Sequence, residues 1–280
     1  MKRSLNQLRL LILTLTITCA GMPSLFAQRP KPYEVQVSYQ KSVLPATVVD
    51  LPYPPDVVEE SIKDYMGRQG WKSSGSRGYR VYKNMKLDDT ARWLHDMHIK
   101  VEKKSSRDNT SSIVTILTAG PNEDPATRTG KDEALMRRTA AFVERMLPAI
   151  EAGDLEDRIK SQESDTKKAQ GKLGGLHDDQ GSLEKKIRDT EDDLKKNKED
   201  QVRETQSMQS SVKNDDAAMK KSHKKLEKLM DDQANMQKKL TRYQSDLELN
   251  KKNQEFQRSA ADQQQKTLDS LKTLRKPSRA

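Results

Sequence analysis

The sequence predicts an α+β N-terminal domain, built from an antiparallel sheet with two helices, followed by a long α-helical coiled coil. Several segments before residue 120 alternate apolar and polar residues with the period of strands. From Ser182 to Lys276 the chain contains neither Gly nor Pro, the residues that break helices most strongly. Hydrophobic residues make up 32% and charged residues 34% of the 280 residues, so a compact core must be confined to part of the chain.

The N-terminal residues predict a secretory signal peptide over 1–27. A positively charged start precedes an apolar run from Leu10 to Ala20, which is too short to cross a bilayer. Cleavage after Ala27 would leave Gln28 first; cleavage after Ala20 and acylation of Cys19 are the alternatives. We therefore expect a periplasmic or extracellular protein that is not transmembrane. A mature chain without Cys19 has no thiol, which excludes disulfides and thiol catalysis.

The α+β domain is expected over 28–153. Tyr33 to Tyr39 alternates with period two and predicts a strand, and a second, short strand is expected at 48–51. A helix should begin at Asp56, capped through Glu59, and end at Gly67 or Gly70. Three more strands and a second helix are expected further along, at 79–85, 94–102, 112–118 and 131–150. Pro148 should kink or end that last helix.

The second half is expected to be mostly helical, with a Gly-rich hinge over 154–181, a coiled-coil helix over 182–276 and a basic tail at 277–280. A continuous helix of that length would run about 140 Å. The heptad register changes near Met208–Val212, which we interpret as a stutter. The alternative is a turn within Ser207–Asp216 that folds the tail into a helical hairpin. The best-populated coiled-coil seam consists of Leu226, Leu229, Met236, Leu240, Tyr243 and Leu247.

One cluster resembles metal-binding or acid–base machinery, namely His95, Asp96 and His98. On a strand, Asp96 and His98 share a face whereas His95 points the other way, so only two ligands converge and a zinc site needs three or four. We therefore expect solvated strand residues, with no catalytic residue, cofactor or metal. A possible ligand face, which sheet aromatics and a cation would form, consists of Trp71, Arg77, Tyr79, Tyr82 and Trp93.

These observations favour an exported, non-enzymatic structural or adaptor protein. The coiled coil would assemble the protein, by self-association or with a protein partner, or would span a distance. The α+β domain would dock on an envelope partner. The alternative is a binding module whose α+β domain holds a small apolar or anionic ligand. The net charge of +10 is spread along the chain. It suits weak contact with an anionic envelope surface, and no nucleic-acid partner is expected.

Overall fold

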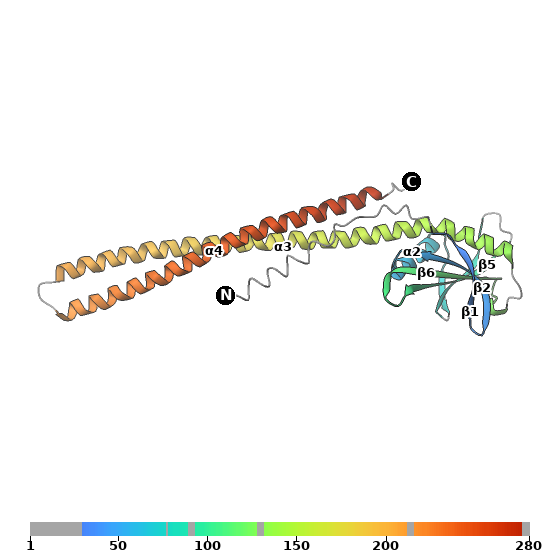
Figure 1. The fold of residues 1–280 in the computed structure, drawn as a ribbon, viewed down its shortest axis with the longest axis horizontal. Coiled ribbons are helices and arrows are strands. Elements are labelled where there is room, and N and C mark those ends of the chain that lie inside the picture. Colours follow the sequence, from blue (N-terminus) through green and yellow to red (C-terminus); the bar gives the residue numbers. More distant parts are fainter. Residues whose placement is uncertain (1–29, 77, 89–92, 128–131, 212–215, 276–280) are drawn as a thin grey trace. The chain divides into compact units, whose positions relative to one another are not determined.

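The computed structural model describes residues 30–76, 78–88, 93–127, 132–211 and 216–275. The expected signal peptide at 1–27, Arg77 and the basic tail at 277–280 lie outside these residues. The chain divides into two compact units after Asp154. The first unit contains an antiparallel sheet and helices, and the second contains helices only (Figure 1). The protein is therefore of mixed α+β class, as the sequence predicted.

The first unit holds a curled six-stranded sheet in the order β1-β2-β6-β5-β4-β3, in which every neighbouring pair is antiparallel. Strands β1 and β2, and likewise β5 and β6, lie next to one another because turns of two residues join them. The strands and helices of this unit are β1 (Tyr33–Tyr39), β2 (Ser42–Leu51), α2 (Pro55–Arg68), β3 (Ser73–Ser76), β4 (Tyr79–Met85), β5 (His95–Ser105), β6 (Asp108–Ala119), η1 (Pro125–Thr127) and the start of α3 (Glu133–Ser211).

The main core lies between one face of the sheet and the two helices. Helix α2 contributes Val58, Ile62 and Met66, each at most 1% exposed. The first part of α3 adds a wide apolar stripe, and the sheet supplies alternate residues of its strands, as period-two alternation requires. The helix expected at 131–150 thus does cover the sheet. Its core residues in α3 are Leu135, Phe142, Val143, Met146, Leu147 and Ile150.

A second, smaller core fills the other face of the sheet. Tyr39 of β1 and Tyr79 of β4 meet there edge to face, with ring centroids 5.4 Å apart, although three strands separate β1 from β4 in the sheet order. A flat sheet would hold these strands about 19 Å apart, at roughly 4.8 Å per strand. The contact therefore requires the strong curl of this sheet.

The local structure differs from the sequence-based expectations at three places. Helix α2 begins at Pro55 without a side-chain cap, since proline suits the first helical turn, and Glu59 instead pairs with Arg80. Strand β3, which ends two residues before Gly78, was not among the expected strands. Pro148 does not end α3, which continues to Ser211.

The second unit contains two long helices, the part of α3 from Leu155 and helix α4 (Asp216–Leu274), which we call the helical hairpin. They lie side by side in opposite directions (Figure 1). Gln180 pairs with Gln254, and Gln201, further along α3, pairs with Gln233, nearer the start of α4. A continuous helix over 182–276 is therefore wrong, and the hairpin alternative is correct. The register change near Met208–Val212 falls where α3 ends, at Ser211, so it does not lie inside one continuous helix as a stutter would.

The expectation of a glycine-rich hinge over 154–181 is also wrong, because α3 is helical throughout these residues. Gly171, Gly174, Gly175 and Gly181 are exposed, and a Cβ added at any of them would meet nothing within 4 Å. Their conformational penalty in a helix is about 1 kcal/mol each relative to Ala. The pairing with α4 on either side of these glycines offsets that penalty.

Candidate functional site

The four described residues of the expected ligand face, Trp71, Tyr79, Tyr82 and Trp93, do not form one surface. Tyr82 is 1% exposed in the main core, whereas Tyr79 lies in the smaller core on the opposite face of the sheet. Trp71 is half-buried against Phe142, with centroids 6.0 Å apart, and Trp93 is 71% exposed. Tyr79 and Tyr82 are three residues apart on one strand, so strand geometry already separates their side chains.

Asp96 and His98 are buried, which corrects the expectation of solvated strand residues. Asp96 is 2% exposed and His98 is 7% exposed, both on the face of the smaller core. The Asp96 carboxylate accepts the backbone N–H groups of Asn84 and Asn122, each at 2.9 Å. Both asparagines have positive φ, 55° and 59°, a conformation that asparagine tolerates better than most residues. Asp96 therefore holds two turns in place, which is a structural role.

The His98 ring packs edge-on against the ring of Tyr39, with centroids 6.1 Å apart. Its Nδ1 atom is buried and has no hydrogen-bond partner among the described residues. Burial lowers the pKa of His98, although the nearby carboxylates of Asp124 and Asp96 partly oppose this. The ring is therefore held mainly in its neutral form. Within the described part of the chain, no group of three or more His, Cys, Asp or Glu side chains is placed to hold a metal.

The α+β unit offers little room for a small molecule at the pocket beside α2. That pocket, between α2, β4 and β5, measures about 70 Å³, and the ion pair of Arg80 with Glu59 lies at its wall. The Arg80 Nε donates to Glu59 Oε1 at 2.6 Å. Drug-sized ligands usually occupy about 300–1,000 Å³. This space suits a few water molecules, and its strongest polar groups already bind each other.

The predicted coiled-coil seam forms one half-buried stripe on α4. Its six apolar members are half-buried and lie three or four residues apart, except that Gln233 occupies the seam position between the second and the third. They are Leu226, Leu229, Met236, Leu240, Tyr243 and Leu247. The heptad positions of α3 show the same pattern, with Ile159 at 1% and Leu194 at 7% exposure. Towards the C-terminal end of α4, Ile159 packs with Leu268 and Leu271 in a small apolar cluster.

Polar residues in the seam of one helix meet polar residues in the seam of the other. Gln254 Nε2 donates to Gln180 Oε1 at 2.7 Å, and Gln201 Nε2 donates to Gln233 Oε1 at 2.8 Å. Gln162 and Gln264 make a third such pair. Glutamines at seam positions in both halves were visible in the sequence. The sequence did not show which glutamines pair, because a coiled coil between two separate chains would have brought other glutamines together.

Ion pairs flank the seam at its two ends. Lys225 Nζ lies 2.5 Å from Glu204 Oε2, and this hydrogen bond lowers the pKa of Glu204. Lys272 Nζ lies 2.8 Å from Glu163 Oε1 and lowers the pKa of Glu163 in the same way. Each pair joins α3 to α4. They favour the observed antiparallel register, in which opposite charges meet at both ends.

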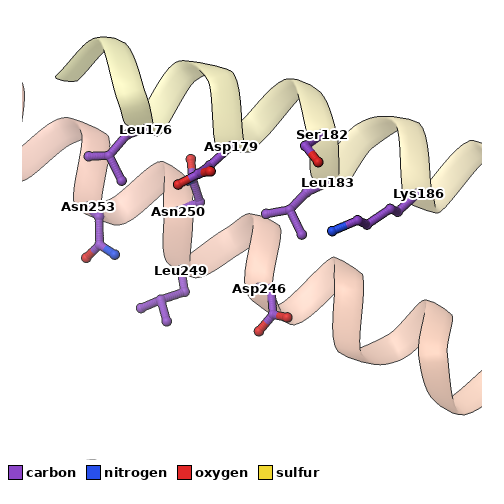
Figure 2. Close-up of a pocket in the computed structure, with 9 residues that line it drawn as sticks. All are labelled: Leu176, Asp179, Ser182, Leu183, Lys186, Asp246, Leu249, Asn250 and Asn253. Atoms are coloured by element: carbon purple, nitrogen blue, oxygen red, sulfur yellow. The ribbon is translucent and has the colours of Figure 1, made fainter. Parts of the chain in front are cut away.

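One side of the hairpin carries an open groove, shown in Figure 2. It measures about 350 Å³ and is lined by Leu176, Asp179, Ser182, Leu183, Lys186, Asp246, Leu249, Asn250 and Asn253. Leu249 is 50% exposed, whereas Asn250 is buried and accepts a hydrogen bond from Gln254 at 2.6 Å. We call this surface the hairpin groove. The groove is open and combines an exposed Leu with charged and amide groups, so it does not resemble a closed, mostly apolar ligand site.

None of the helices in the described ranges combines the length and the apolar character needed to cross a bilayer. Comparisons with protein-family models, with curated proteins and with solved structures each found no match to this chain.

Proposed function

We propose that this chain is an exported, non-enzymatic structural or adaptor protein. In this proposal the α+β unit docks on a partner of the cell envelope, and the helical hairpin, paired as an antiparallel coiled coil, holds a second protein. Export rests on the signal-peptide pattern of residues 1–27, with Gln28 as the first mature residue. The observation on which the proposal rests is the hairpin groove, an exposed surface on the long helical hairpin.

The length of the hairpin supports a reaching role. Its α3 part, from Leu155 to Ser211, extends about 85 Å at roughly 1.5 Å per residue. This is shorter than the rod expected for one continuous helix, but it still exceeds the diameter of a small domain. A long two-helix surface suits contact with an elongated partner better than it suits chemistry at one point.

The apolar seam of α4 is already covered by α3 of the same chain, so a partner protein is not expected to bind at the seam. The seam residues of α4 face α3 of the same chain, and the polar pairs Gln180–Gln254 and Gln201–Gln233 fix that register. Assembly with another helix would therefore use an outer side of the hairpin. The hairpin groove, with exposed Leu249, is the side that we assign to a protein partner.

The alternative is a binding module in which the α+β unit holds a small apolar or anionic ligand. The filled main core and the pocket of about 70 Å³ favour the adaptor over this alternative. Native mass spectrometry of the protein purified from its own cells separates the two. A stoichiometric small molecule on the protein would favour the binding module.

The adaptor proposal is tested by photo-crosslinking in cells that export the protein. A photoreactive amino acid at Leu249 places the probe in the hairpin groove, and the same probe at Ser245 is the control because Ser245 is exposed on the same helix but does not line the groove. We expect a discrete protein adduct from position 249 and none from position 245. Adducts of equal yield at both positions, or none at either, would contradict the proposed docking surface.

A further inference from the structure

Strand β1 is one edge of the sheet, and its sequence is nearly symmetric about its centre. The strand reads YEVQVSY, so Gln36 is flanked on both sides by valine and the strand ends in tyrosine at both ends. Tyr33 is 45% and Val35 is 39% exposed, and Gln36 and Ser38 are exposed as well. A long exposed edge strand with apolar residues is a template for pairing with another strand.

The main-chain groups at the centre of β1 point away from β2. Tyr39 and Ser42 close the β1–β2 turn across two residues, so they form a hydrogen-bonded pair, and the pairs alternate from there along the strand. Gln36 and Ser38 are therefore in non-hydrogen-bonded positions relative to β2. Gln36 lies opposite Pro45, which has no N–H group to donate in any direction. The N–H and C=O groups of Gln36 thus face the open side of the sheet.

We propose that β1 pairs antiparallel with β1 of a second copy of this chain, around a two-fold axis at Gln36. This register places Val35 opposite Val37 of the other copy, Tyr33 opposite Tyr39, and Glu34 opposite Ser38. Gln36 meets its own copy through the main-chain groups that face outward. Valine–valine and aromatic pairs stabilise antiparallel strands, and no like charges face each other in this register. A two-fold interface of this kind is self-complementary and closes after two copies.

The opposite edge of the sheet indicates why the pairing stops at a dimer. Strand β3 has only four residues, SSGS, with no apolar side chain. Short polar edges are one way in which proteins avoid strand addition. Strand β1, in contrast, has seven residues and contains no Pro, Lys or Arg. The sheet is therefore protected at one edge and open at the other, which favours a closed pair of sheets over a growing array.

Disulfide cross-linking of the full exported protein tests the register. Gln36→Cys places a thiol on the two-fold axis, where the Cα atoms of a hydrogen-bonded antiparallel pair are about 5.5 Å apart, within disulfide range. Ser38→Cys is the matched control, on the same exposed edge but opposite Glu34 of the other copy. If Cys19 persists in the purified chain, it is replaced by serine in both variants. We expect a covalent dimer from Gln36→Cys that forms at least tenfold faster than from Ser38→Cys.

A charge test uses the same position without any thiol. Ser38→Lys would face Glu34 of the other copy twice per dimer, and Ser38→Glu would place carboxylates there instead. We expect the two variants to shift the dimer dissociation constant in opposite directions, each by about twofold to thirtyfold, as measured by sedimentation. Shifts of the same sign, or equal cross-linking at positions 36 and 38, would overturn the proposal. So would a wild-type chain that stays monomeric at every accessible concentration, as expected if β1 instead accepts a strand from a different protein.

Discussion

The two units of this chain hide apolar surface in different ways. The α+β unit gathers its large side chains between sheet and helices, where residues such as Val143 and Met146 are fully buried. The hairpin leaves most of its seam half-buried and places polar residues at regular intervals along it. The first unit is therefore stabilised mainly by packing. In the second, paired glutamines and ion pairs decide which of the many possible alignments of two helices forms.

The strongest test of this comparison is a large-to-small change in each unit. We expect Phe142→Ala to lower the unfolding free energy of the α+β unit by about 3–5 kcal/mol, because the ring is 2% exposed. Phe256→Ala in the hairpin should change stability by no more than about 0.5 kcal/mol, since Phe256 is 55% exposed. Tryptophan fluorescence in urea measures the first unit, because both tryptophans of the protein lie there. Similar losses for the two variants would contradict the comparison.

Glycines in the same helix sharpen the comparison further. A Cβ at Gly153 would lie 1.9 Å from Ser61 Oγ and 3.0 Å from Ser61 Cβ, so Gly153→Ala should destabilise the α+β unit by about 1–3 kcal/mol. Gly174→Ala should instead stabilise the hairpin by up to about 1 kcal/mol, because the site is open and alanine favours helix. Thermal unfolding measures both changes in stability, with fluorescence as the signal for Gly153→Ala and far-UV circular dichroism for Gly174→Ala. The first variant should unfold at a lower temperature than the wild type and the second at a higher one. A stabilising Gly153→Ala would show that α2 and α3 do not approach closely there.

Polar pairing in the hairpin predicts a non-additive double mutant. Gln201→Leu alone leaves Gln233 without its partner across the seam and should cost about 1 kcal/mol, and Gln233→Leu should behave alike. The double variant should recover that loss or exceed wild-type stability, while its dimers and higher oligomers increase, because the register is no longer specified. The wild type, the two single variants and the double variant form a double-mutant cycle. Circular dichroism measures the stability of each protein, and sedimentation measures its oligomeric state. Additive losses would mean that the two glutamines do not interact.

The smallest expected effect is on the pH dependence of stability, and it concerns the α+β unit and not the hairpin. Burial lowers the pKa of His98 below its unfolded value of 6.5, so the unfolded state binds more protons as the pH falls below about 6.5. The stability contribution of neutral His98 is therefore present above that pH and is lost progressively below it. His98→Leu should flatten the pH dependence of urea unfolding between about pH 6.5 and 5, as read by tryptophan fluorescence. His223→Gln, at an exposed position of α4, is the control and should leave the fluorescence transition unchanged, because both tryptophans lie in the first unit.

The sequence was informative wherever one face of an element is buried. The stripe from Leu135 to Ile150 and the seam from Leu226 to Leu247 follow from periodicity, because burial on one face imposes it. The burial of Asp96 was not predictable in this way. Its environment depends on turns at Asn84 and Asn122, which only the sheet order brings together. The reversal between α3 and α4 was also ambiguous, since an unbroken run without Gly or Pro is compatible with either a rod or a hairpin.

The antiparallel hairpin has a mechanical consequence. Arg275 pairs with Glu156, so the beginning and the end of the helical unit meet at one end of it. Tension applied between these two points would separate the helices one heptad at a time, beginning with the Ile159 cluster, rather than loading every contact at once. Each step would break only the few contacts of one layer. Such an unzipping geometry yields under small forces and closes again when they are removed, so the unit would act as a compliant element wherever both of its ends are held.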